Sequence, residues 1–82
     1  MSAADHYVRD MVMLMIERGL EAKARRDAQA RDADREQAAF ESGRATAYYE
    51  VVSTMLGQLE VFGLTRLALH LPEEFDSDRE LL

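Results

Sequence analysis

Two apolar stripes with the same spacing constrain this chain more than any other feature. Steps of 4, 3, 4 and 3 residues separate the members of each stripe, which are Val8, Val12, Met15, Gly19 and Ala22, then Tyr48, Val52, Met55, Leu59 and Phe62. Side chains at these steps share one side of an α-helix, as in packed helices. Because no proline precedes Pro72, nothing interrupts a helix before that point. The sequence therefore predicts an all-α protein in which two long helices pair as an antiparallel hairpin.

The position of the turn follows from pairing the two stripes. Residues 21–39 separate them and are rich in alanine and charge. Antiparallel pairing of the stripe centres places the turn within residues 31–35. There, Asp34 with Gln37 three residues later has the form of a capping box that begins a helix. We therefore expect helices over 4–31 and 34–62. A break at Ser42-Gly43, or one unbroken rod, is the alternative.

The region after the second stripe contains signals for a helix end and a further short helix. Gly63 is a candidate helix C-cap, with Leu64 as its hydrophobic contact. Thr65 is a candidate N-cap for a short helix over 65–71, which would end before Pro72. We expect four side chains to lie on the end of the bundle, namely Leu64, Leu67, Leu71 and Phe75. An acidic tail, 73–82, completes the single domain, 1–82.

The apolar surface of both helices is wider than one partner helix covers. Ala47, Tyr49, Val51 and Leu56 widen the second stripe to about half of the helix circumference. Residues 11–16, MVMLMI, are apolar in every direction. We therefore expect two hairpins to pair as a homodimer, a four-helix bundle, with help from the C-terminal residues. The predicted interface comprises Met11, Leu14, Met15, Tyr48, Val51, Val52, Met55, Leu59 and Phe62.

Length and composition support self-association. The chain has 82 residues and no cysteine, which excludes disulfides and thiolate metal sites. A core in a chain this small rarely supplies more than about 3–5 kcal/mol, so a partner subunit is the most available source of extra burial. The first 16 residues lack the features of a secretory signal, and no apolar run is long enough to span a bilayer. We expect a cytoplasmic protein that does not bind a membrane.

Motifs for catalysis, metals or nucleic acid are weak. The M-x-M-x-M pattern at Met11, Met13 and Met15 suits Cu(I), but on a helix Met13 points away from the other two, so packing is the simpler interpretation. His6, Asp10, His70 and Glu73 would meet at one end of the hairpin, although exposed, unrelated histidines are the simpler expectation. Residues 62–71 have a helix-turn-helix layout, but Pro72 shortens the second helix and the net charge of −6 repels phosphate. We expect no enzyme activity, no cofactor, no metal and no direct contact with nucleic acid.

The tail carries most of the net negative charge, −4 of the −6 of the whole chain. Residues 73–82 hold five acids, Glu73, Glu74, Asp76, Asp78 and Glu80, against one arginine. The leading functional hypothesis is a small protein–protein interaction module that acts as a helical homodimer and binds another, unidentified protein. The alternative is an acidic regulator or inhibitor that occupies a basic nucleic-acid-binding surface of a target protein. Phe75, Leu81 and Leu82 recur among the acids, which favours a tail that docks by its apolar side chains.

Overall fold

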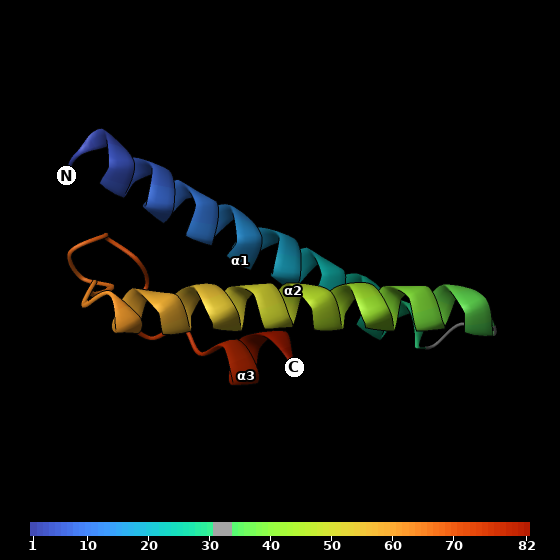
Figure 1. Cartoon of the computed structure of the whole chain (residues 1–82). Helices are drawn as coiled ribbons and strands as arrows, with labels where there is room; N and C mark the ends of the chain where they lie inside the picture. Colours follow the sequence, from blue (N-terminus) through green and yellow to red (C-terminus); the bar gives the residue numbers. More distant parts are fainter. Residues whose placement is uncertain (31–33) are drawn as a thin grey trace.

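The computed structural model describes residues 1–30 and 34–82, and in those residues it contains three α-helices and no β-strand (Figure 1). Helix α1 spans Ala3–Gln29, α2 spans Arg35–Val61 and α3 spans Ser77–Leu81. The two long helices run side by side in opposite directions and α3 packs on both of them. The predicted antiparallel hairpin is therefore confirmed, in a molecule of 48 × 20 × 17 Å.

Helix α1 begins one residue earlier than the sequence pattern predicts, because Ser2 caps it. The Ser2 hydroxyl accepts from the Asp5 amide, and the Asp5 carboxylate accepts in return from the Ser2 amide, each at 3.1 Å. This reciprocal pair is a complete capping box. At the other end α1 stops at Gln29, with Ala30 as its C-cap. The predicted helix end at residue 31 and the centre of the predicted turn lie outside the described residues.

Helix α2 begins at the predicted N-cap. The Asp34 carboxylate accepts from the Gln37 amide at 3.1 Å. The Gln37 side chain donates to the Glu41 carboxylate at 3.0 Å, so in the described residues only the Asp34 half of the predicted capping box forms. The alternative break at Ser42-Gly43 is wrong, since α2 continues through both residues. The hairpin therefore has two helices of equal length.

The end of α2 is a Schellman motif, as Gly63 and Leu64 predict. Gly63 has a φ of 70°, in the left-handed region that glycine adopts without strain. Its amide donates to the Glu60 carbonyl at 3.0 Å, and the Leu64 amide donates to the Leu59 carbonyl at 2.8 Å. These bonds satisfy carbonyls that the helix end would otherwise leave without partners. They also reverse the chain toward the hairpin.

The predicted short helix over 65–71 is wrong. Residues 66–70 form turns, and His70 has a positive φ of 55°. The reason is that Leu69 and Leu71 are both buried. Residues two apart on a helix point to opposite sides, so a helix would bury one and expose the other. The turn at His70 directs both inward, whereas the predicted contacts Leu64 and Leu67 are exposed.

The C-terminal residues complete the core. Leu69, Leu71 and Leu81 pack with side chains of the long helices, which are Val12, Ile16, Val52 and Leu59. Helix α3, which lies within the predicted acidic tail, brings Leu81 over Gly19. A Cβ placed on Gly19 would lie 3.1 Å from a Leu81 methyl carbon, so the glycine makes room for that side chain. None of the described helices is long and apolar enough to cross a membrane.

Candidate interaction surface

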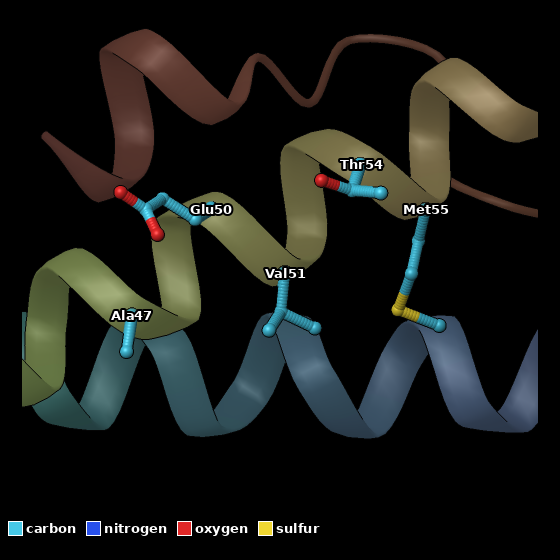
Figure 2. A pocket seen from close by; sticks show the side chains of 5 residues that line it. All are labelled: Ala47, Glu50, Val51, Thr54 and Met55. Carbon is cyan, nitrogen blue, oxygen red and sulfur yellow. The ribbon is translucent and has the colours of Figure 1, made fainter.

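An apolar hollow of about 440 Å³ lies on the surface of α2 (Figure 2). Ala47, Val51 and Met55 follow one another along α2 at steps of four residues and line one side of the hollow. Glu50 and Thr54 line the other side. Val51 is 43% exposed although it lies near the middle of α2. The row presents methyl and thioether groups to the surface, with a single carboxylate beside them.

A second hollow of about 300 Å³ adjoins the first and extends it toward the end of α2. The two share Thr54 and Met55, and the second adds Val8 and Val12 of α1 and Phe62 and Leu64 beyond them. No residue of the C-terminal segment 73–82 lines either hollow. Together they form one apolar surface, which we call the open face and define by Val8 of α1, by Ala47, Val51 and Met55 of α2, and by Phe62 and Leu64 after α2.

The predicted interface residues divide into two groups. Val52 and Leu59 are buried inside the single chain, so they belong to its own core. Met11, Met15, Tyr48 and Met55 are half-buried. Leu14, Val51 and Phe62 are exposed, Phe62 to 75%. One hairpin with its tail therefore leaves seven of the nine predicted positions incompletely covered.

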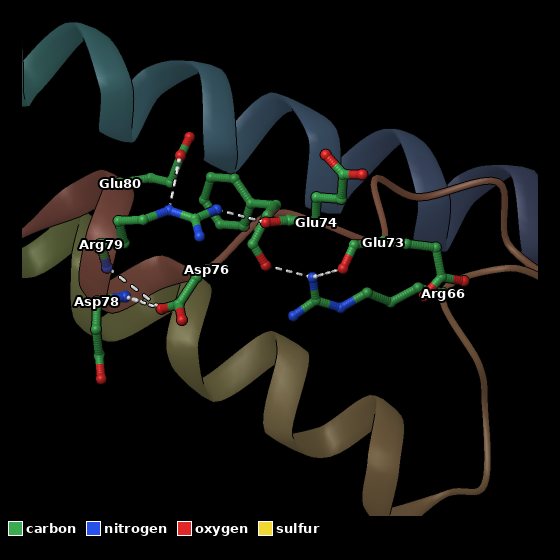
Figure 3. Close-up of polar contacts among 8 residues, drawn as sticks. Arg66, Glu73, Glu74, Asp76, Asp78, Arg79 and Glu80 are labelled. Carbon is green, nitrogen blue, oxygen red and sulfur yellow. Dashed lines mark hydrogen bonds and ion pairs between the residues drawn. The ribbon is translucent and has the colours of Figure 1, made fainter.

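Residues 66–82 cover the opposite face of the hairpin. Polar contacts stabilise the conformation of this segment (Figure 3). The Arg66 guanidinium donates to three backbone carbonyls, those of Pro72, Glu73 and Phe75. Arg79 donates to the Glu74 carbonyl at 2.6 Å. These bonds hold parts of the C-terminal segment to one another, and hydrogen bonds from Tyr49 to Asp78 and from Ser53 to Ser77 join it to α2. The tail thus protects one apolar face and leaves the other open.

Three of the five tail acids have structural partners. Asp76 is the N-cap of α3 and accepts from the amides of Asp78 and Arg79 at 2.9 and 3.2 Å. The Asp78 carboxylate accepts from the Tyr49 hydroxyl, and Glu80 pairs with Arg79 at 3.4 Å. Glu73 and Glu74 are exposed. Of the apolar residues predicted to dock, Leu81 is buried and Phe75 is half-buried, whereas Leu82 is exposed.

The contact between Tyr49 and the tail has an electrostatic consequence. The hydrogen bond to Asp78 raises the pKa of Tyr49, because ionising the phenol would place two negative charges together. At the other end of the chain, the hydrogen bonds from Ser2 lower the pKa of Asp5 by stabilising its carboxylate. Both groups lie away from the open face.

A charged cluster lies at the turn end of α2. The Glu41 side chain is 7% exposed, and its two oxygens meet Gln37 at 3.0 Å and Arg44 at 3.9 Å. The Arg44 guanidinium also lies over the Tyr48 ring, 5.5 Å from its centroid, in a cation–π contact. Arg44 thus pairs with an acid of its own helix, whereas the carboxylate of Asp27 on α1 pairs with Arg26.

Sequence reasoning missed several residues of the open face. Val8, Thr54, Gln58 and Leu64 line the hollows but are absent from the predicted interface. Val8 was detectable, since it belongs to the first apolar stripe. Thr54 and Gln58 carry no apolar signal, and only their position beside Met55 places them there. His6 and His70 are exposed, and the described residues hold no group of three or more acids, histidines or cysteines placed to bind a metal ion.

Comparison of the chain with protein-family models, with curated proteins and with solved structures found no match.

Proposed function

We propose that this protein is a small interaction module that works as a homodimer, with the open face as the contact between its two copies. The observation that carries the proposal is the pair of adjoining hollows, which continue along the side of the hairpin that the tail leaves uncovered. Two such faces would form a four-helix bundle whose second layer is another copy of the hairpin.

The small size of the core supports a second copy as the occupant. Within the described residues, seven apolar side chains form the buried cluster, and three of those, Leu69, Leu71 and Leu81, lie after α2. Met55, which lines both hollows, is half-buried, and a methionine adapts its shape to a partner surface more readily than a branched side chain does. Burying this face would add stability to a chain of a size at which a single core rarely supplies more than about 3–5 kcal/mol.

The tail contacts favour this function over an acidic regulator of a basic surface. A charge decoy needs its carboxylates free, whereas Asp76, Asp78 and Glu80 bond within the chain. Leu81 anchors the same segment in the core. The acidic segment therefore serves first as a cover for one side of the hairpin.

The test compares two aspartate substitutions on one helix. Val51 lies in the open face, and Val61 is exposed elsewhere on α2 and lines neither hollow. Sedimentation equilibrium of the wild-type chain at low micromolar concentration should give twice the 9.3 kDa monomer mass. Val51→Asp should shift the protein to monomer with its helical circular dichroism retained, and Val61→Asp should leave the dimer intact. A wild-type monomer at this concentration would refute the proposal.

A further inference from the structure

We propose that Met55 is a modification site, at which oxidation of the thioether to the sulfoxide blocks the homodimer. The oxidant is hydrogen peroxide. It transfers one oxygen atom to the sulfur, its O–O bond breaks and water leaves, so the sulfur loses two electrons and the peroxide gains them. The inference rests on the proposed homodimer and adds a chemical control of its contact surface.

Met55 lies where the two hollows of the open face meet. The chain has five methionines, all within the described residues, and Met55 lines both hollows whereas the other four line neither. Figure 2 shows its side chain projecting from α2 on the same side as Ala47 and Val51. A partner that covers both hollows must therefore cover Met55, whatever the orientation of the two copies.

In a single copy the sulfoxide is compatible with the fold. Met55 is half-buried, so part of its side chain is in contact with solvent. Peroxide can reach the thioether there, and water can solvate the oxygen of the product. The buried cluster of the hairpin does not include Met55, which packs against it from the outside. Oxidation of the free chain should therefore leave the helices intact.

In the dimer the same oxygen would be buried among apolar groups. Val8, Val12, Phe62 and Leu64 are among the side chains that line the hollow beside Met55. A sulfoxide converts the flexible apolar side chain into a polar one, and burying a polar group without a hydrogen-bond partner is unfavourable. Each dimer contains two copies of Met55. At about tenfold for each sulfoxide, oxidation of both should weaken the dimer by about a hundredfold.

A glutamine at position 55 tests the effect without oxidant, because it places a carbonyl group where the sulfoxide would lie. Met13→Gln is the matched control. Met13 is also half-buried, but it lines a hollow that α1 forms with the C-terminal segment. Met55→Gln should weaken the dimer by about a hundredfold with helical circular dichroism retained, and Met13→Gln should stay within about threefold of wild type. Sedimentation equilibrium gives both dissociation constants.

Peroxide oxidation of the wild-type chain is a second measurement that needs no substitution. Because the dimer covers Met55, its oxidation rate should fall by at least about tenfold between protein concentrations well below and well above the dissociation constant. The oxidation rate of Met13 should be the same at both concentrations. Tandem mass spectrometry of proteolytic peptides measures each rate separately. This measurement decides the question even if Met55→Gln fails to fold.

The outcomes separate this inference from the proposed function. A wild-type chain that is monomeric at low micromolar concentration refutes both. A wild-type dimer that a folded Met55→Gln variant does not weaken refutes the inference alone. So does a wild-type dimer in which Met55 is oxidised equally fast at both concentrations.

Discussion

Replacing Leu81 with alanine tests whether the C-terminal segment is part of the core. Leu81 is 1% exposed and packs over Gly19, where no side chain on α1 can move in to fill the space it leaves. Three carbon atoms are lost, worth about 0.8 kcal/mol each by transfer. A cavity term adds to this, and buried leucines in general lose about 2–5 kcal/mol. We expect Leu81→Ala to lower the free energy of unfolding by about 3 kcal/mol.

Leu82→Ala is the matched control, because the neighbouring leucine is 56% exposed. The contact that Leu82 makes with Arg26 uses the backbone carbonyl, which the substitution retains. An exposed position of this kind changes stability by less than about 0.5 kcal/mol. Urea unfolding followed by circular dichroism, with all variants at the same protein concentration, measures the difference between the two.

A third variant, with residues 73–82 deleted, sets the upper limit of the effect. If residues 73–82 detach before the hairpin unfolds, Leu81→Ala can lower the free energy of unfolding by no more than the free energy with which this segment docks. The unfolding curve of Leu81→Ala would then coincide with that of the deletion variant. Equal stability of Leu81→Ala and Leu82→Ala would contradict the reasoning, because it would mean that α3 contributes nothing to the core. The deletion should also expose apolar surface and promote aggregation.

Two other predictions concern the polar contacts of the same segment. The hydrogen bond to Asp78 raises the folded pKa of Tyr49 above 10, so Tyr49 contributes stability that is present below pH 10 and is lost as pH rises through the folded pKa. Tyr49→Phe should remove this alkaline loss, which urea unfolding at increasing pH measures. Changing all five tail acids to Asn or Gln should leave dimerisation almost unchanged at two salt concentrations, since Asn also caps helices and can replace Asp76. A strong, salt-dependent loss of binding to a captured partner would instead support the acidic regulator.

Helix boundaries were predictable where the signals are local. Asp34 caps α2 and Gly63 ends it, because a carboxylate that accepts an amide and a glycine that adopts a positive φ need only their neighbours in sequence. The apolar stripes likewise identify Val12, Val52 and Leu59 as core residues, since a helix fixes which side chains share a side. The same local reasoning failed at residues 65–71, where Thr65 and Pro72 frame a plausible helix but the burial of both Leu69 and Leu71 requires a turn.

The sequence by itself determined that two long helices form and pair. The signals for this are the helical repeat of apolar residues, the helix caps and the absence of proline before Pro72, and each depends only on residues that are close in the sequence. Only the tertiary structure decided which apolar face the chain covers for itself. Leu81 packs over Gly19. Arg66 holds the loop before α3 by donating hydrogen bonds to its backbone carbonyls, which no pattern of side chains reveals. Covering one face in this way leaves Val51 and Met55 on the other. That choice depends on contacts between residues far apart in the chain, which local patterns do not encode.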